Sequence, residues 1–177
     1  MPIQTAECWN QELETASPSL LRGIEEEKLR KQLQYARGAS AFYRQKWERD
    51  GAIVDRVRHV ADLAQLPFTE KAELQDAQDE TMPLGRNQCV SLDRLVRMQA
   101  TGGTTGRPLR MGLTRHDVET YNEVGARAAW AAGVRPGDVL FECMNYSLYA
   151  GGVNDHMTFE TVGACVAPVG IGQSQRL

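Results

Sequence analysis

The sequence has no long apolar run and no excess of charge of either sign. No stretch approaches the roughly 18 consecutive apolar residues of a membrane-spanning helix, and residues 1–10 lack the basic start and apolar core of a secretory signal. A formal net charge of −3 provides no basic footprint for nucleic acid or an anionic membrane. We therefore expect a globular, cytoplasmic protein with no nucleic-acid or membrane partner.

Cysteine is scarce and scattered. The four cysteines are Cys8, Cys89, Cys143 and Cys165, and they include no C-x-x-C pair and no neighbouring histidine at the spacing of metal ligands. Cys143 and Cys165 lie in apolar, strand-like runs, where buried and unreactive thiols are the usual finding. We expect all four cysteines to be reduced and structural, and we assign no metal site.

The chain changes character near residue 90. Residues 1–90 show the apolar periodicity of helices after a loosely ordered arm over 1–19, with helices at 24–37, around Phe42, Tyr43 and Trp47, and at 70–79 behind a Thr69 cap. We interpret the aromatic trio as core packing. From residue 91 strands and helices alternate. The sequence predicts an α/β protein, helical over 1–90, followed over 91–177 by β-α-β units of an incomplete, mainly parallel sheet.

The second half contains clear helix and strand boundaries. Thr114 and Asp117 form the pattern of a capping box at the start of a helix over 115–132. Strands are predicted at 139–144 and 164–169, with a short helix over 158–162 between them. This order predicts one β-α-β step, in which the two strands run parallel.

A Gly/Thr-rich segment joins two strand-like runs, 95–99 and 109–113. Its glycines free the backbone, while its threonine hydroxyls and successive N–H groups can converge on anionic oxygens. It lacks the Walker spacing, because Arg107 is followed by Pro108. The residues alone leave two interpretations open. One is an ordinary hairpin loop, and the other is a phosphate-holding loop formed by Thr101, Gly102, Gly103, Thr104, Thr105, Gly106 and Arg107.

A second polar segment follows the strand over 139–144. Ligands of open α/β sheets gather at the carboxyl ends of the strands, and this segment occupies such an end. The candidate binding residues there are Tyr146, Tyr149, Gly151, Gly152 and His156. The alternative that the residues leave open is an ordinary glycine-rich loop between a strand and a helix, with a hydrogen-bonded His156.

Four stretches together resemble the phenylacetate–CoA ligase group of the adenylate-forming (AMP-binding) superfamily. Residues 101–108, T-G-G-T-T-G-R-P, are similar to the superfamily's phosphate loop. The other stretches are L-P-F-T-E-K at 66–71, A-G-V-R-P-G-D at 132–138, and Y-S-L-Y-A-G-G at 146–152 followed by His156. The order and spacing hold from about Tyr35 to the end of the chain. Gly102 departs from the usual serine, and Ser147 and Tyr149 depart from the usual glycine and phenylalanine.

The resemblance implies an ATP-dependent acid–thiol ligase. A carboxylate attacks the α-phosphate of ATP to give an acyl-adenylate and pyrophosphate, and the thiolate of coenzyme A then displaces AMP. ATP, Mg2+, coenzyme A and an aryl carboxylate are the implied ligands. The resemblance places residues 101–107 at the ATP phosphates and the five residues Tyr146, Tyr149, Gly151, Gly152 and His156 around the acyl group. It assigns no catalytic residue and no metal ligand to this chain.

Members of the group are more than twice as long as this chain. The resemblance therefore implies an N-terminal portion that we expect to be inactive alone. As a partner we expect either further copies of this chain in a homo-oligomer or a second chain that supplies the remaining C-terminal part. Two alternatives stay open. One is a non-catalytic nucleotide-binding or interaction module, and the other is an adenylyltransferase similar to the coenzyme F390 synthetases, which adenylate a hydroxyl group of a deazaflavin.

Overall fold

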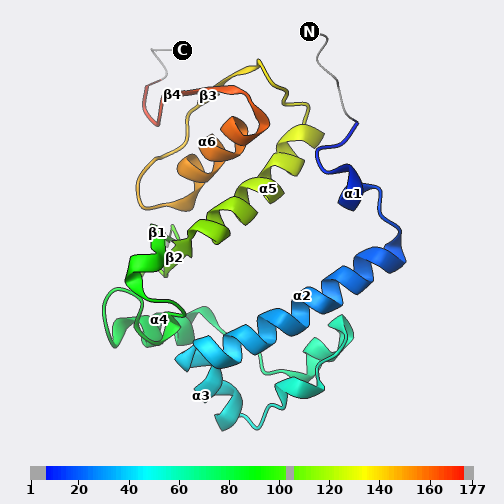
Figure 1. Ribbon diagram of the computed structural model, residues 1–177. Helices are drawn as coiled ribbons and strands as arrows, with labels where there is room; N and C mark the ends of the chain where they lie inside the picture. Colours follow the sequence, from blue (N-terminus) through cyan, green and yellow to red (C-terminus); the bar gives the residue numbers. More distant parts are fainter. Residues whose placement is uncertain (1–6, 103–105, 174–177) are drawn as a thin grey trace. The chain divides into compact units, whose positions relative to one another are not determined.

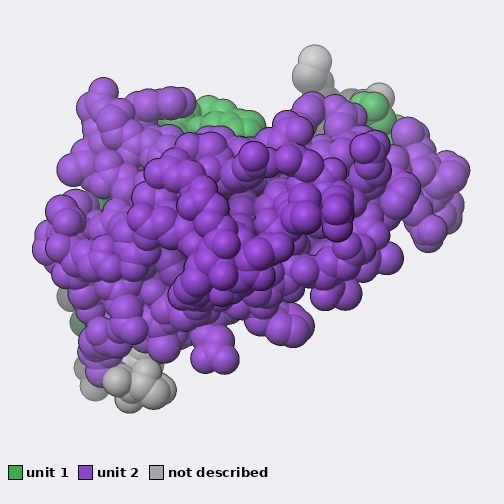
Figure 2. Space-filling view, turned by 90° about the horizontal axis from the view of Figure 1, so that it is seen from below, with its two compact units in different colours: residues 1–15, 96–102, 113–177 green, residues 16–95, 103–112 purple. Residues whose placement is uncertain are grey.

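The computed structural model describes residues 7–102 and 106–173 of the chain. It divides into two compact units, shown in different colours in Figure 2. The helical unit comprises residues 16–95 and 103–112, and the α/β unit comprises residues 1–15, 96–102 and 113–177. The domain division predicted between residues 90 and 91 stays a prediction.

The described part of the helical unit contains three helices and four 3-10 turns. The helices are α2 (Pro18–Ala39), α3 (Ala41–Arg49) and α4 (Lys71–Asp79), and the turns are η1 (Val54–Arg56), η2 (Val60–Gln65), η3 (Gly85–Asn87) and η4 (Leu92–Arg94) (Figure 1). The start predicted for α2 is wrong by more than a turn. Ser17 caps this helix by accepting a hydrogen bond from the Leu20 N–H, and Pro18 fits the first helical turn.

An aromatic cluster forms the core of the helical unit. Leu33 of α2 and Trp47 of α3 are buried together with Val54 and Val57, and Tyr43 packs against them. The ring centroids of Tyr43 and Trp47 lie 5.1 Å apart, and Phe42 is buried beside them. The interpretation of this aromatic trio as core packing is confirmed.

Helix α4 begins with a carboxylate cap rather than the predicted Thr69. Glu70 is the N-cap residue, and the Glu73 side chain accepts a hydrogen bond from the Glu70 N–H at 2.9 Å. The same carboxylate accepts a 2.7 Å hydrogen bond from Nζ of Lys46, a buried lysine of α3. Glu73 therefore joins α3 to α4, because its carboxylate is the counter-charge of a lysine removed from water.

We expect the Lys46–Glu73 pair to make folding stability depend on pH. The hydrogen bond from Lys46 lowers the pKa of Glu73 below its usual 4.5, so the unfolded chain binds this proton more readily. The stabilisation is fully present above the unfolded pKa and is lost as the pH falls through the lower folded pKa. Urea unfolding from about pH 7 to about pH 3 should show wild type and Glu73→Gln separated at the high end and converging at the low end. A separation that stays constant, as we expect for the exposed control Glu48→Gln, would contradict this role.

The α/β unit contains a parallel strand pair that packs on one helix, and that helix packs on another. Its elements are α1 (Gln11–Glu14), most of β1 (Leu95–Ala100), the end of β2 (Arg110–Thr114), α5 (Arg115–Ala131), β3 (Val139–Glu142), α6 (Ala150–Val162) and β4 (Cys165–Pro168). The two sheets have the orders β1-β2 and β3-β4. Strands β3 and β4 are parallel, with Val139 opposite Cys165. Helix α6 lies between this pair and α5, as Figure 1 shows. The predicted α/β class with parallel strands is confirmed.

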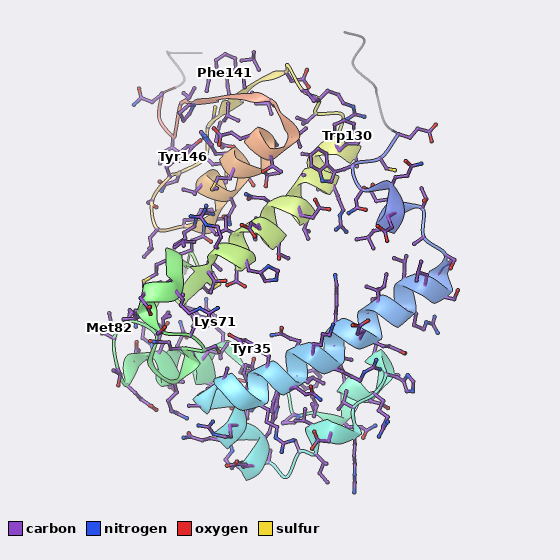
Figure 3. The ribbon with its side chains drawn as sticks, viewed as in Figure 1. Tyr35, Lys71, Met82, Trp130, Phe141 and Tyr146 are labelled. Atoms are coloured by element: carbon purple, nitrogen blue, oxygen red, sulfur yellow. The ribbon has the colours of Figure 1, made fainter. Side chains whose placement is uncertain are left out.

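Helix α5 starts as the sequence predicts. The Thr114 side chain accepts from the Asp117 N–H, and the Asp117 carboxylate accepts from the Thr114 N–H at 2.7 Å. Its end packs on the N-terminal segment, where the Trp9 and Trp130 ring centroids lie 5.6 Å apart and the Trp9 indole donates to Glu123 at 2.8 Å (Figure 3). The prediction that residues 1–19 form a loosely ordered arm is wrong for the described segment around Trp9, because these contacts hold that segment on α5.

The predicted burial of Cys143 and Cys165 is wrong, although all four cysteines are free thiols. Both cysteines are exposed. Their apolar surroundings suggested burial, but the β3-β4 pair packs on α6 and leaves other apolar side chains, Val139 and Phe141, exposed as well. Among the described residues, none of the helices has the length and apolar character needed to cross a membrane.

Candidate functional site

The Gly/Thr-rich segment lies between β1 and β2, as predicted. The structure describes its two ends, Thr101–Gly102 and Gly106–Arg107, while the candidates Gly103, Thr104 and Thr105 lie outside the described residues. Gly106 has a φ of +96°, a conformation that glycine adopts without strain. The backbone freedom inferred from the sequence is therefore used at this position.

Arg107 follows the loop and faces acidic side chains of α4. Its guanidinium donates hydrogen bonds of 2.9 Å to Asp76 and 2.9 Å to Asp79. The hydrogen bond to Asp76, together with the charges of both carboxylates, raises the pKa of Arg107 above its usual value. The assignment of Arg107 to a bound phosphate stays a prediction, and the structure places its guanidinium on two carboxylates.

The end of β1 is joined to the chain just before α6. The Ala100 N–H donates to the Leu148 carbonyl at 2.8 Å, and Ala100 forms a parallel β-bridge with Tyr149. A Cβ atom at Gly102 would lie 3.2 Å from Cδ2 of Tyr149, and one at Gly151 would lie 2.7 Å from Cε1 of the same ring. The Tyr149 ring therefore lies between two glycines, and the start of the Gly/Thr-rich segment, up to Gly102, is a neighbour of Tyr149 within the α/β unit.

Helix α6 begins at Ala150, eight positions before the predicted 158. The candidates Gly151, Gly152 and His156 are therefore helical rather than part of a loop, which corrects the sequence interpretation. Paired glycines disfavour a helix, but a Cβ at Gly152 would lie 2.7 Å from the Asn145 carbonyl oxygen. Close packing of this first turn explains why glycine occurs where helix propensity argues against it.

Tyr146 and His156 are brought together across the start of α6. The Tyr146 hydroxyl and His156 Nδ1 form a 3.0 Å hydrogen bond, and His156 Nε2 lies 3.1 Å from a Glu160 carboxylate oxygen. Figure 3 shows Tyr146 on the segment that leads into α6. Burial, and after it the negative charge of Glu142, raises the pKa of Tyr146 above its usual 10.0. The hydroxyl therefore stays protonated at neutral pH and can take part in hydrogen bonding.

A buried polar network beside these residues was missed by the sequence analysis. The Asn154 side-chain oxygen accepts hydrogen bonds from Arg97 Nη1 at 2.8 Å and Gln99 Nε2 at 2.9 Å, and Asn154 is only 1% exposed. Arg97 also contacts the sulfur of Met157, and burial lowers its pKa. The available signal was the alternation of Arg97 and Gln99 on one face of a strand, which places two polar side chains against α6.

No cluster of three or more His, Cys, Asp or Glu side chains capable of holding a metal ion occurs within 7–102 and 106–173. The chemistry that this region offers consists of hydroxyl and N–H donors, an aromatic ring between two glycines and a protonated tyrosine.

Comparisons with known proteins agree with the sequence motifs. The chain is 36% identical over 165 residues to the phenylacetate-coenzyme A ligase of Thermus thermophilus, covering 93% of this chain and 36% of that protein. It is 33% identical over 177 residues to the corresponding ligase of Aromatoleum evansii, covering 99% of this chain and 39% of that protein. The chain thus spans less than half the length of these curated relatives. No family model matches it.

The fold agrees with a solved acyl-CoA ligase. A crystal structure of 2-hydroxyisobutyryl-CoA ligase in complex with 2-HIB-AMP and CoA matches with a TM-score of 0.90 and 30% sequence identity, covering 99% of this chain and 38% of that chain. A second structure of this ligase, in the postadenylation state with 2-HIB-AMP, also matches with a TM-score of 0.90, at 28% identity. Over nearly its whole length the chain is therefore similar to part of the phenylacetate–CoA ligases, and its fold matches that of the N-terminal part of adenylate-forming ligases.

Proposed function

We propose that this chain supplies the ATP-phosphate loop and the acyl-recognition segment of an acid–CoA ligase of the phenylacetate–CoA ligase type. The observation that carries the proposal is the close approach of the Tyr149 ring to Gly102, where a Cβ atom would lie 3.2 Å from the ring, supported by the bridge between Ala100 and Tyr149. In adenylation the reacting carboxylate must reach the α-phosphate of ATP, so a phosphate loop and an acyl pocket must be neighbours.

The proposed reaction has two steps. A carboxylate oxygen attacks the α-phosphorus of ATP and pyrophosphate leaves, and the sulfur of coenzyme A then attacks the acyl carbon and AMP leaves. Mg2+, when bound with ATP, neutralises developing charge. The six loop residues Thr101, Gly102, Gly103, Thr104, Thr105 and Gly106 hold the β- and γ-phosphates through hydroxyl and N–H donors. Their contribution is positioning and electrostatic, without a covalent intermediate on this chain.

The acyl group is proposed to bind beside Tyr146, Tyr149, Gly151, Gly152 and His156. The Tyr149 ring supplies an apolar face, and its hydroxyl suits an aryl acid that carries a polar substituent. Tyr146 presents a protonated hydroxyl hydrogen-bonded to His156. Support for the reaction class comes from the solved relative, which holds the acyl-adenylate 2-HIB-AMP together with CoA.

ATP affinity tests the phosphate role of the loop in the 177-residue chain. We expect Thr104→Val to weaken ATP binding by roughly 2- to 10-fold in isothermal titration with Mg2+, because one hydroxyl donor is lost at nearly constant shape. The matched control is Thr120→Val, at an exposed position of α5, which should leave the affinity unchanged. Equal ATP affinity of wild type and Thr104→Val would refute the phosphate role.

Carboxylate-dependent exchange between ATP and pyrophosphate then separates the ligase from the alternatives. With phenylacetate or hydroxyphenylacetates, we expect no exchange by this chain alone and exchange when the remaining part of a relative is supplied. ATP binding without exchange in either mixture would favour the non-catalytic module. Exchange that requires a deazaflavin hydroxyl instead of a carboxylate would favour the F390 synthetase-like activity.

A further inference from the structure

Four side chains of α4 contact residues 107–110, at the end of the Gly/Thr-rich segment and just after it. All of these residues belong to the helical unit. The four side chains are those of Gln75, Asp76, Gln78 and Asp79, and together they are called the α4 clamp below. Gln78 is 1% exposed. Its Nε2 donates to the Pro108 carbonyl at 2.8 Å, and its Oε1 accepts from the Arg110 N–H at 2.8 Å.

The side-chain amides of the two clamp glutamines form hydrogen bonds with backbone atoms rather than with side chains. Gln75, which is also buried, donates to the Arg107 carbonyl. A buried glutamine is costly unless its amide is hydrogen-bonded, and Gln75 and Gln78 find their partners in the backbone over 107–110. This backbone therefore cannot move away from α4 without leaving buried polar groups unpaired.

The two carboxylates of the clamp bind the guanidinium groups of the same segment. Arg107 donates to Asp76 and Asp79, and Arg110 donates to Asp79 at 3.3 Å and to the Pro83 carbonyl at 2.6 Å. Two arginines and two aspartates leave this group with no net charge. Arg107 therefore attracts an approaching phosphate far less than an isolated guanidinium would.

We infer that Arg107 is a positioning residue: it fastens the exit of the Gly/Thr-rich segment to the α4 clamp and does not itself bind phosphate. The phosphate loop then depends on hydroxyl and N–H donors, and α4 sets the direction in which the chain leaves it. This inference deepens the proposed function, on which its consequence for ATP binding rests. Its structural half can be tested without ATP.

Hydrogen exchange of the Arg110 amide in the ligand-free chain is the direct test. This amide is hydrogen-bonded to the buried Gln78, so its exchange reports on the clamp. We expect Arg107→Gln to accelerate its exchange by about tenfold or more, with no change at amides of α2. Asp76→Asn combined with Asp79→Asn should give the same acceleration, and adding Arg107→Gln to it should add little.

The matched control is Arg22→Gln, which removes a guanidinium from an exposed position of α2. It should leave Arg110 exchange unchanged. Unchanged exchange in Arg107→Gln itself would overturn the inference, because a phosphate ligand with no anchoring role would leave this amide protected. Since the substituted side chains Arg107, Asp76 and Asp79 are all partly exposed, these variants are suited to folding normally.

ATP titration of the same variants tests the functional half. Arg107→Gln and the Asp76→Asn/Asp79→Asn variant should weaken ATP binding by similar factors, because each breaks the same anchor. Tighter binding by the aspartate variant would overturn the inference, since it would indicate a guanidinium released toward the phosphate. If wild type binds no ATP, the proposed function fails, and the exchange of the Arg110 amide still decides whether the clamp exists.

Discussion

Replacing Asn154 with alanine should lower the free energy of unfolding by about 2–4 kcal/mol. Its side-chain oxygen accepts hydrogen bonds from both Arg97 and Gln99, and the residue is almost completely buried. Truncation leaves a partly buried guanidinium and a buried amide without this acceptor, and each loss costs about 1–3 kcal/mol. Urea denaturation followed by circular dichroism measures the effect.

Two further variants separate the network from simple loss of volume. Asn154→Asp keeps the oxygen that Arg97 and Gln99 use and gives Arg97 a counter-charge, but it loses the 3.4 Å hydrogen bond from Asn154 Nδ2 to Gln99 Oε1. We therefore expect a loss smaller than that of Asn154→Ala. Arg97→Met combined with Asn154→Ala should cost less than the sum of the two single changes, because the guanidinium that would lack a partner is removed. A loss below about 1 kcal/mol in Asn154→Ala, or an equal loss in Asn154→Asp, would contradict the role of the network.

The Asn154 network also bears on the proposed site. Gln99 and Arg97 lie on β1, and the same strand carries Ala100, which is bonded to the segment before α6. Weakening the hold of α6 on β1 should therefore let the Tyr149 ring move relative to Gly102. The network contributes to the site by holding β1 and α6 in place rather than by direct contact with a ligand, since neither Asn154 nor Gln99 is exposed.

Local signals in the sequence predicted the elements around the Gly/Thr-rich segment well. The strands on both sides, the capping box of Thr114 and Asp117, and the parallel step from β3 to β4 follow from neighbouring residues, and each is present. Motif resemblance pointed to the same ligases that the comparisons find, because four stretches in the same order are specific where a single Gly/Thr string is not.

The errors arose where tertiary contacts decide the outcome. The first turn of α6 contains Gly151 and Gly152. Because glycine has a low helix propensity, the sequence predicted a helix start later than the observed one. Packing against the Tyr149 ring and the Asn145 carbonyl compensates for that cost. The partners of Asn154 lie more than fifty residues away in sequence, so no local pattern could reveal them.

Arg107 shows the same limit at the candidate site. Its place after a glycine-rich loop suggested a cation for phosphate, and its acidic partners on α4 lie about thirty residues earlier in the chain. A sequence can indicate that a charge is present near a loop, but the neutralising partner is found only when the chain is folded. Phosphate contact by Arg107 and its anchoring role therefore make opposite predictions for the aspartate variants.

Gly85→Ala should destabilise the helical unit by about 3–5 kcal/mol. Gly85 has a φ of +55°, and a Cβ there would lie 2.0 Å from the Ala77 carbonyl oxygen and 2.8 Å from Cα of Gln78. These atoms are backbone of α4, so the clash cannot be relieved by rotating a side chain. The helix itself would have to shift, and the buried Ala77 and Gln78 would shift with it.

Gly51→Ala is the matched control for backbone strain. Gly51 lies in the same unit with a φ of +65°, and a Cβ there would meet no atom within 4 Å. This change should cost only about 1–2 kcal/mol, the penalty of the left-handed conformation. Equal losses in the two variants would contradict the predicted clash with α4. Because Gln78 also holds the Arg110 N–H, Gly85→Ala should accelerate exchange of that amide while Gly51→Ala does not. The placement of α4 would then determine both the stability of the helical unit and the path of the chain after the proposed phosphate loop.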